Sequence, residues 1–301
     1  MVKKNILITG ATGLIGSALI KKLSKNGYTP VILSTSRSEE RLNIYKWNPL
    51  LETCDKLPDG EYHGIINLAG ASIADTRWNK AGKEVIEQSR TASTLFLKNV
   101  VDGLPNPPKH IISVSAIGYY GVINDEIKTE NSPNGNDFAA LVCKDWEDAA
   151  KQLETTNSDL SILRIGIVLV QKGGFYKKIS NLAKWKIAAP IGTGMQPVCW
   201  IHIEDLITIF LSILDEKLNP GVYNAVASIS SNKEVTKEIV YKSSQPFVWP
   251  AIPSFLIKLI FGEKAEIFTK GAKISNSKLL NAGFDFQFTD LNKAITNLAK
   301  D

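Results

Sequence analysis

The chain opens with a short apolar run that leads directly into three regularly spaced glycines. The run covers residues 5–9, and the glycines follow at positions 10, 13 and 16. This order predicts a strand, a tight turn and a helix start, because glycine permits the sharp turn and the close approach of backbone amides. Free amides in the first turn of such a helix attract phosphate. The opening therefore predicts a dinucleotide-binding loop, whose contact residues we expect to be Gly10, Thr12, Gly13, Leu14, Ile15 and Gly16.

Apolar runs alternate with helical patterns through the first half of the chain. Runs typical of buried strands cover residues 29–35, 63–69, 110–115 and 160–170. Apolar side chains at helical spacing predict helices over residues 80–101 and 144–153, and an Asp cap at Asp290 predicts a C-terminal helix over 290–299. Buried parallel strands joined by helices are typical of a doubly wound sheet. The pattern predicts an α/β, Rossmann-type fold.

The alternation weakens after about residue 170, where glycine and proline become frequent and short helices dominate. We therefore predict that residues 1–170 form the dinucleotide-binding domain, to which strands and helices near residues 200–226 return. Residues 171–301 are predicted to form mainly a smaller substrate lobe with a C-terminal domain.

Composition limits the kinds of partner that we expect. With 301 residues, 44% hydrophobic and 22% charged, the chain can form one large domain or two lobes. Basic residues exceed acidic ones by five and are scattered, which argues against nucleic acid and membrane surfaces. The three cysteines lack metal-binding spacing, so we expect buried free thiols and no metal site. Without an apolar stretch of membrane-spanning length, the sequence predicts a cytoplasmic protein that binds small molecules.

Four motifs resemble, in order and spacing, those of extended short-chain dehydrogenases/reductases of the NAD-dependent epimerase/dehydratase type. They are Thr9-Gly-Ala-Thr-Gly-Leu-Ile-Gly16, Asn67-Leu-Ala-Gly70, Ser115-Ala-Ile-Gly-Tyr-Tyr-Gly121 and Trp200-Ile-His-Ile-Glu-Asp205. Lys144-Asp-Trp-Glu147 is similar to a motif of an atypical, epimerase-like branch that carries its own C-terminal domain. The resemblance implies a nicotinamide cofactor and a small polar or sugar-nucleotide-like substrate. It also implies a homodimer paired through helices 80–101 and 144–153.

The end of the second predicted strand indicates which cofactor is preferred. Enzymes that prefer NAD usually place a carboxylate there, whereas this chain has Ser34, Ser36 and Arg37. Hydroxyls and a guanidinium suit a 2′-phosphate, so NADP is favoured over NAD. The alternative is that Arg37 lies on a solvated loop, paired with Glu39 or Glu40, and that Glu39 serves NAD.

Two further cofactor contacts are implied by the family resemblance. Leu68, Ala69 and Gly70 match the segment that passes beneath the cofactor ribose, although a plain strand-end turn would have the same residues. Lys144 matches the lysine of the family's Tyr-x-x-x-Lys pair, which bonds the nicotinamide ribose. The competing interpretation is an exposed lysine in a helix, and we favour the ribose role.

The expected catalytic residues depart from the family pattern. Ala140 stands where the family has its acid/base tyrosine, and alanine has no proton to give. Ser115 lies 25 residues before Ala140, as the family spacing requires for the catalytic serine. Counting back from Gly121 instead puts Ala116 at that place, so the register of the serine stays open.

Other side chains are candidates to move a proton or to hold a substrate. Tyr119 and Tyr120 follow the end of a predicted strand, where doubly wound sheets form their ligand crevice, or else they wall a pocket. Candidate substrate contacts, each with a structural alternative, are Arg77, Trp78, Trp200 and His202.

The sequence thus leaves two function classes. In the first, an NADP-dependent oxidoreductase or epimerase works with a substitute for the missing tyrosine. In the second, an NADP(H)-binding regulatory protein does little chemistry. Ala140 favours the second class, whereas Lys144 and a whole substrate lobe favour the first.

Overall fold

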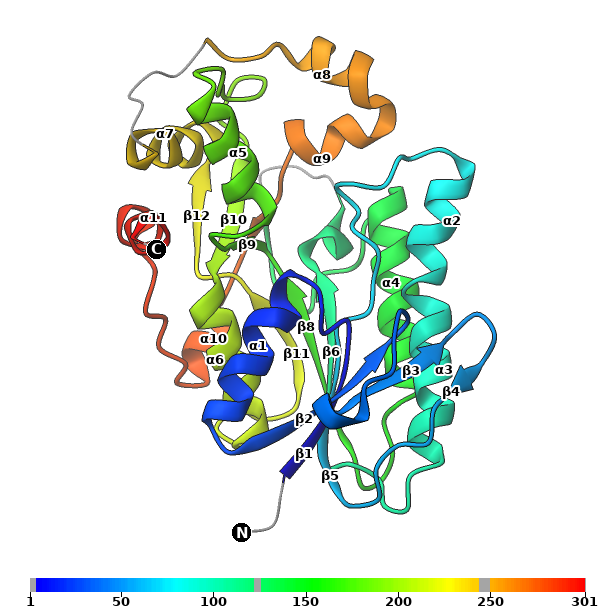
Figure 1. Ribbon diagram of the computed structural model, residues 1–301. Helices are drawn as coiled ribbons and strands as arrows, with labels where there is room; N and C mark the ends of the chain where they lie inside the picture. The colour runs from blue at the N-terminus through cyan, green and yellow to red at the C-terminus, as the bar shows by residue number, and fades with distance from the viewer. Residues whose placement is uncertain (1–3, 122–125, 244–249, 301) are drawn as a thin grey trace. The chain divides into compact units, whose positions relative to one another are not determined.

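A computed structural model describes residues 4–121, 126–243 and 250–300 (Figure 1). The chain divides into two compact units. The first contains residues 1–115, 141–164 and 207–223, and the second contains residues 116–140, 165–206 and 224–301. These units interleave along the chain, and residues 207–223 belong to the first of them.

The largest sheet has eight strands in the order β11-β8-β6-β5-β1-β2-β3-β4. In sequence order these are β1 (Lys4–Thr9), β2 (Tyr28–Ser34), β3 (Ile44–Asn48), β4 (Thr53–Cys54), β5 (Tyr62–Asn67), β6 (His110–Ala116), β8 (Asp159–Ile165) and β11 (Gly221–Ala225). The β1 strand pairs in parallel with β2 and β5, β2 with β3, and β5 with β6, while β4 is antiparallel to β3. This mostly parallel order confirms the predicted Rossmann-type fold.

Helices connect the parallel strands. They are α1 (Leu14–Lys25), α2 (Lys80–Gln88), α3 (Thr91–Asp102), α4 (Phe138–Lys151) and α6 (Ile203–Leu214), with short 3-10 turns η1 (Glu40–Leu42) and η2 (Ile117–Tyr120). Figure 1 shows α1 on one side of the sheet and α2 and α3 on the other. Right-handed crossovers between parallel strands produce this two-sided cover.

One buried apolar cluster of the first unit lies on the α3 side of the sheet. Leu7, Leu33 and Ile65 come from β1, β2 and β5 and belong to one buried cluster with Phe96 and Leu97 of α3. Side chains alternate along a strand, so this face of the sheet is apolar over several neighbouring strands. The cluster fixes the strand ends that form the candidate site.

The second unit contains two small sheets. One has the order β12-β10-β9, built from β9 (Ile167–Leu169), β10 (Pro197–His202) and β12 (Ser228–Ser231). The other pairs β7 (Ile127–Lys128) with β13 (Lys273–Ile274). Its remaining helices are α5 (Gly174–Lys184), α7 (Asn232–Lys242), α8 (Ser254–Phe261), η3 (Gly262–Ala265), α9 (Glu266–Thr269), α10 (Ser277–Asn281) and α11 (Leu291–Ala299). Tyr120, Cys199, Val226 and Ile274 form a buried cluster in this unit.

Two predicted elements are divided in the structure. The predicted strand over 160–170 ends at Ile165 and resumes as β9 in a different sheet. The predicted helix over 80–101 is interrupted at Ser89 and Arg90, between α2 and α3. The final helix forms as predicted, and the Asp290 side chain accepts a hydrogen bond from the Lys293 amide. Over the described ranges, no helix is both long and apolar enough to cross a membrane.

Candidate cofactor site

The glycine loop joins β1 to α1 in a conformation that depends on its glycines. Gly10 has a φ of +65°, and a Cβ there would lie 2.5 Å from the Leu68 carbonyl oxygen. A Cβ on Gly16 would lie 2.5 Å from the Gly10 carbonyl oxygen. The Gly13 amide donates to that same carbonyl at 3.0 Å, and Gly13 is the N-cap of α1. The loop therefore packs tightly on the end of β5 and leaves the first amides of α1 available to an anion.

A buried polar network holds this loop against the neighbouring strand ends. The Thr9 hydroxyl donates to Asn67 Oδ1 at 2.7 Å and accepts the amides of Leu68 and Ala69 at 3.1 Å each. Asn67 Nδ2 donates to the Thr94 hydroxyl at 2.9 Å. Since buried polar groups are costly unless paired, this network fixes the ends of β1 and β5 relative to each other.

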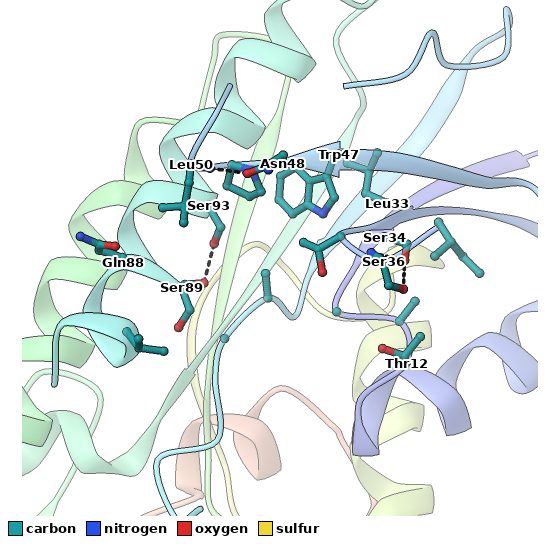
Figure 2. A pocket seen from close by; sticks show the side chains of 18 residues that line it. Thr12, Leu33, Ser34, Ser36, Trp47, Asn48, Leu50, Gln88, Ser89 and Ser93 are labelled. Atoms are coloured by element: carbon teal, nitrogen blue, oxygen red, sulfur yellow. Dashed lines mark hydrogen bonds between the residues drawn. The ribbon is translucent and has the colours of Figure 1, made fainter. Parts of the chain in front are cut away.

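A cavity of about 440 Å³ lies beside the glycine loop, entirely within the first unit. Its lining residues are Gly10, Ala11, Thr12, Ile32, Leu33, Ser34, Thr35, Ser36, Trp47, Asn48, Pro49, Leu50, Ala69, Gly70, Val85, Gln88, Ser89 and Ser93. Figure 2 shows Ser34, Ser36 and Thr12 on one side of this cavity and Gln88 and Ser89 on the other. Of the predicted cofactor contacts, Gly10, Thr12, Ser36, Ala69 and Gly70 line it.

The other predicted contacts lie outside this lining. Gly13, Leu14, Ile15 and Gly16 continue from the loop into α1, and Leu68 lies beneath Gly10. These positions are the N-cap and first turn of the helix, where the exposed groups are backbone amides.

The two hydroxyls predicted from the sequence to bind a 2′-phosphate, those of Ser34 and Ser36, lie at the end of β2. The Ser34 and Ser36 hydroxyls lie 3.1 Å apart, and the Ser36 amide donates to the Ser34 hydroxyl at 3.3 Å. The Arg37 guanidinium pairs with the Glu39 carboxylate at 3.1 Å, and 60% of the Arg37 side chain is exposed. This ion pair is the alternative that the sequence left open for Arg37. Such an exposed pair contributes about 0–1 kcal/mol, so the guanidinium is easily redirected.

The turn after β3 contributes lining residues that the sequence analysis missed. Asn48 Oδ1 accepts the amides of Leu50 and Leu51 at 3.1 and 3.2 Å, which bends the chain and places Leu50 over the cavity (Figure 2). Trp47 lies beneath and is buried. The signal available in the sequence was the Trp47-Asn-Pro-Leu50 run, in which an Asx turn follows an apolar strand.

The second missed group comes from α2 and the start of α3. Val85, Gln88, Ser89 and Ser93 line the cavity at helical spacing. Their spacing predicted a helix. It did not show which face of the helix meets a ligand, because small and apolar side chains can pack against a sheet as well as line a cavity.

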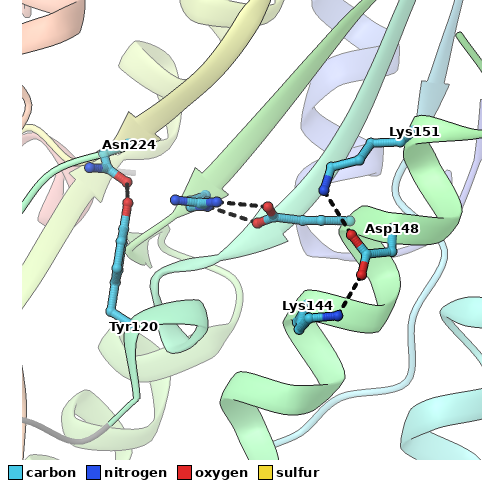
Figure 3. Close-up of polar contacts among 7 residues, drawn as sticks. Tyr120, Lys144, Asp148, Lys151 and Asn224 are labelled. Atoms are coloured by element: carbon cyan, nitrogen blue, oxygen red, sulfur yellow. Dashed lines mark hydrogen bonds and ion pairs between the residues drawn. The ribbon is translucent and has the colours of Figure 1, made fainter. Parts of the chain in front are cut away.

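Lys144 lies on α4 and is ion-paired. Its Nζ lies 2.7 Å from Asp148 Oδ2, and Lys151 Nζ lies 2.7 Å from Asp148 Oδ1 (Figure 3). Hydrogen bonds from Lys144, the larger effect, and from Lys151 hold the pKa of the Asp148 carboxyl below its usual value. The Lys144 side chain is 44% exposed. The ammonium is therefore a half-exposed cation on the helix that also carries Ala140.

The same helix, α4, carries Glu147, which forms a buried ion pair with Arg164 of β8. Arg164 Nε donates to Glu147 Oε1 and Arg164 NH2 to Oε2, each at 2.8 Å. Both side chains are almost fully buried. This bidentate arrangement pairs both charges and ties β8 to α4.

The candidate catalytic residues at the end of β6 and just after it are mostly buried. The Ser115 hydroxyl has no hydrogen-bond partner among the described residues. The Tyr120 hydroxyl donates to Asn224 Oδ1 at 2.7 Å within the core of the second unit (Figure 3). Tyr119 is half-buried, and its ring packs edge-on against Tyr120 at 5.4 Å between centroids. The phenol of Tyr120 is thus committed to a structural hydrogen bond, whereas Tyr119 is the more accessible of the two.

Arg77 and Trp78 lie in the first unit, just before α2. Arg77 is exposed and Trp78 is half-buried, with its indole N–H donating to the Ile73 carbonyl at 3.4 Å. The Arg77 carbonyl oxygen approaches Gly82 so closely that a Cβ there would meet it. The loop is therefore held against the start of α2, with the Arg77 side chain directed to solvent.

Trp200 and His202 are buried in the second unit. The Trp200 indole N–H donates to the Ser230 hydroxyl at 3.0 Å. The His202 ring stacks on Phe288 with 3.9 Å between centroids, and its Nδ1 accepts the Glu204 amide at 3.2 Å. Burial lowers the pKa of His202 to about 4. These contacts favour the structural alternatives for both side chains.

Metal-binding groups are not assembled in the parts of the chain that are described. No cluster of three or more His, Cys, Asp or Glu side chains suitable for a metal ion occurs there. Burial raises the pKa of the Cys199 thiol to about 11, and its Sγ lies 3.2 Å from the Ala272 carbonyl oxygen. Burial and this raised pKa favour the protonated, unreactive form of the Cys199 thiol, whereas Cys54 is only half-buried.

Comparison with known proteins places this geometry in a family. A family model described as the NAD dependent epimerase/dehydratase family matches residues 6–140, and a domain of unknown function, DUF1731, matches residues 252–298. An epimerase family protein of Staphylococcus saprophyticus is 30% identical, over 98% of this chain and 99% of its own. The mouse epimerase family protein SDR39U1 is also 30% identical, over 97% and 99%.

A solved structure shows the same fold. The crystal structure of human epimerase family protein SDR39U1 with NADPH matches with a TM-score of 0.89 and 28% identity, covering 99% of each chain. The two matched domains confirm the expected combination of an epimerase/dehydratase-type fold and a separate C-terminal domain. With relatives at 30% identity aligned over almost their full lengths, the chain belongs to the epimerase family.

Proposed function

We propose that this chain binds NADP(H) at the glycine loop and its adjoining cavity. The observation that carries the proposal is the loop itself. Gly10 and Gly16 let it pack tightly on neighbouring backbone, where a Cβ would clash, and the first amides of α1 stay available to an anion. The cavity beside it has the mixed apolar and hydroxyl lining that suits an adenosine group. The relative SDR39U1, crystallised with NADPH, supports the same choice of cofactor.

The preference for NADP over NAD rests on the end of β2. Ser34 and Ser36 offer hydroxyl donors to a 2′-phosphate, and Arg37 supplies a positive charge once it leaves Glu39. Replacing an exposed ion pair by a charged hydrogen bond to phosphate is favourable, because the exposed pair contributes little.

We further propose that the protein is an oxidoreductase or epimerase for a small polar or sugar-nucleotide-like substrate. The bound nicotinamide would supply hydride transfer. Lys144 would hold the nicotinamide ribose, exchanging its Asp148 partner for a ribose hydroxyl. Arg77 and Trp78 would bind an anionic group and a sugar face of the substrate. With Ala140 at the tyrosine position, Tyr119 or a water molecule would move the proton.

A second candidate function is an NADP(H)-binding regulatory protein. Ala140 and Ala116 favour it, because neither position offers a proton and Ala140 is fully buried. Under either function the protein would be cytoplasmic. Two copies would pair through helices α2, α3 and α4, and light scattering tests whether this dimer forms.

Titration calorimetry with NADPH, NADP, NADH and NAD tests the cofactor proposal. Tight binding of NADPH and NADP over the other two supports it, and no binding of any nucleotide overturns it. Carbonyl compounds and sugar nucleotides are then added to the NADPH-bound protein while the absorbance of NADPH is followed. Substrate-dependent oxidation supports the enzyme, whereas bound NADPH that no compound oxidises supports the regulatory protein.

A further inference from the structure

Two residues at the junction between α2 and α3, Ser89 and Arg90, both hydrogen-bond the backbone of Ala71. The Ala71 amide donates to the Ser89 hydroxyl at 2.9 Å, and the Ala71 carbonyl accepts Arg90 NH2 at 2.9 Å. Ala69 and Gly70, the two preceding residues, line the cavity. Two consecutive side chains at a helix junction therefore set the orientation of the segment that forms one wall of the cavity.

Arg90 is a buried cation, and no carboxylate among the described residues pairs with it. Only 7% of the residue is exposed. Its two terminal nitrogens donate to the carbonyls of Ile86 and Ala71, at 3.0 and 2.9 Å, and Cζ lies 5.0 Å from the centroid of the Trp146 ring. Among the described residues, its Nε has no hydrogen-bond partner. Carbonyl dipoles and a ring face offset only part of the cost of burying a guanidinium.

Arg164, another buried arginine of the first unit, has its charge balanced in the usual way, by a carboxylate. Arg164 is paired with Glu147 through two hydrogen bonds of 2.8 Å. A structural role alone would favour a similar partner for Arg90, because an unmatched buried charge is strongly destabilising. Since no carboxylate among the described residues pairs with Arg90, a bound anion is the candidate for its countercharge.

Gly70 brings the guanidinium up to the wall of the cavity. A Cβ on Gly70 would lie 3.2 Å from Arg90 Cζ and 3.4 Å from NH2. Gly70 also lines the cavity, so only its backbone separates the cation from the space that a ligand would fill. Inside a protein, where screening by water is weak, a charge acts across such a distance.

We propose that Arg90 is a positioning residue for the cofactor, which fixes the Ala69–Ala71 segment at the cavity and places behind Gly70 a positive charge that an anionic dinucleotide offsets. This inference rests on the proposed binding of NADP(H). It assigns the α2–α3 junction, rather than the glycine loop alone, to the recognition of the cofactor's negative charge.

The test compares the full chain with Arg90→Lys, which keeps the charge but loses the planar fork, and Arg90→Gln, which also loses the charge. Arg164→Lys is the matched control, because it changes a buried arginine whose guanidinium pairs with the Glu147 carboxylate. For each protein we would measure the dissociation constant of NADPH by calorimetry, the melting temperature, and amide hydrogen exchange over residues 68–72.

We expect Arg90→Lys to weaken NADPH binding about tenfold and Arg90→Gln to weaken it further, since each loses a charged hydrogen bond. Exchange over residues 68–72 should quicken in both Arg90 variants. Arg164→Lys should lower the melting temperature and leave the NADPH affinity and this exchange unchanged. NADPH affinity in either Arg90 variant equal to that of the unmodified chain, or an equal loss in Arg164→Lys, overturns the inference. An unmodified chain that does not bind NADPH overturns the proposed function itself.

Discussion

At the scale of single residues, the proposed preference for NADP depends on Arg37, which is ion-paired with Glu39 at the surface. Replacing Arg37 by alanine should weaken NADPH binding by about 1–3 kcal/mol, because a charged hydrogen bond to the 2′-phosphate is lost. NADH lacks that phosphate, so its affinity should change little. Calorimetry with both nucleotides measures the difference.

Arg41 provides the matched control for Arg37. It is an exposed arginine in the following 3-10 turn, so Arg41→Ala removes the same charge from the same region. That variant should bind both nucleotides as the unmodified chain does. Equal weakening of NADPH and NADH in Arg37→Ala would show that the guanidinium does not read the phosphate.

His202 is predicted to make stability depend on pH. Its pKa is about 4 in the folded chain, against 6.5 for a free histidine, because burial disfavours the charged ring. Between these two pH values the unfolded chain binds the proton and the folded chain does not. Stability is therefore complete above pH 6.5 and falls as the pH is lowered towards 4, by about 3 kcal/mol for this group.

The measurement is urea unfolding of the unmodified chain and of His202→Asn at a series of pH values from 7 to 4. Asparagine keeps an acceptor for the Glu204 amide but does not titrate in this range. The difference between the two unfolding free energies should shrink as the pH falls. A constant difference would mean that His202 takes up its proton equally in both states.

At the scale of elements, the strands and helices next to the glycine loop were predictable because each is one uninterrupted pattern. The β1, β2, β5 and β6 strands lie within a residue or two of their predicted ranges. The β3–β4 hairpin was missed, although it supplies Trp47 and Leu50 to the cavity. Its strands are short and carry polar residues, so their place depends on the pairing of β3 with β2 and of β4 with β3, which periodicity along the chain does not encode.

Interruptions within predicted elements were also missed, and Gly166 explains the one between β8 and β9. A Cβ at this position would lie 2.7 Å from the Cys199 carbonyl oxygen and 3.1 Å from a Val226 methyl group. The strand leaves one sheet and enters another at this point, where two backbones approach closely. An apolar run gives no sign of such an approach.

Gly166→Ala should therefore destabilise the fold by about 1–3 kcal/mol, because the added methyl group forces the two backbones apart. Gly103→Ala is the control, since its Cβ would meet nothing closer than 3.5 Å and its φ is −81°. That variant should be as stable as the unmodified chain or about 0.4–1 kcal/mol more stable. Chemical unfolding of both variants gives the two values, and equal stabilities would contradict the proposed close approach.

At the scale of the whole molecule, the two compact units interleave, and the C-terminal region returns to residues far back in the chain. The Asn224 side chain donates to the Ser275 carbonyl, and Gln196 donates to the Phe268 carbonyl. These links join the DUF1731 match at residues 252–298 to the rest of the second unit. The sequence predicted a separate C-terminal domain from resemblance, but it could not show these contacts, since each depends on residues far apart in the chain.

Asp205 is the strongest of these links. Its two carboxylate oxygens accept the amides of Gln287 and Phe288 at 2.8 and 3.0 Å, across 82 and 83 positions of sequence. Burial raises the pKa of this carboxyl while the two amides oppose the rise. Asparagine has one acceptor oxygen, so Asp205→Asn turns an N–H group of the side chain towards one backbone N–H. The buried donor left unpaired should lower the unfolding free energy by about 2 kcal/mol.

Asp285→Asn is the control, because it removes the same charge from an exposed position two residues before Gln287. Its stability should stay within about 0.5 kcal/mol of the unmodified chain. Urea unfolding followed by circular dichroism compares the three proteins, and protease digestion of Asp205→Asn should release the C-terminal region first. Equal stability of the two variants would mean that the C-terminal region is held by its apolar contacts, such as that of Phe288 with His202, and not by the carboxylate.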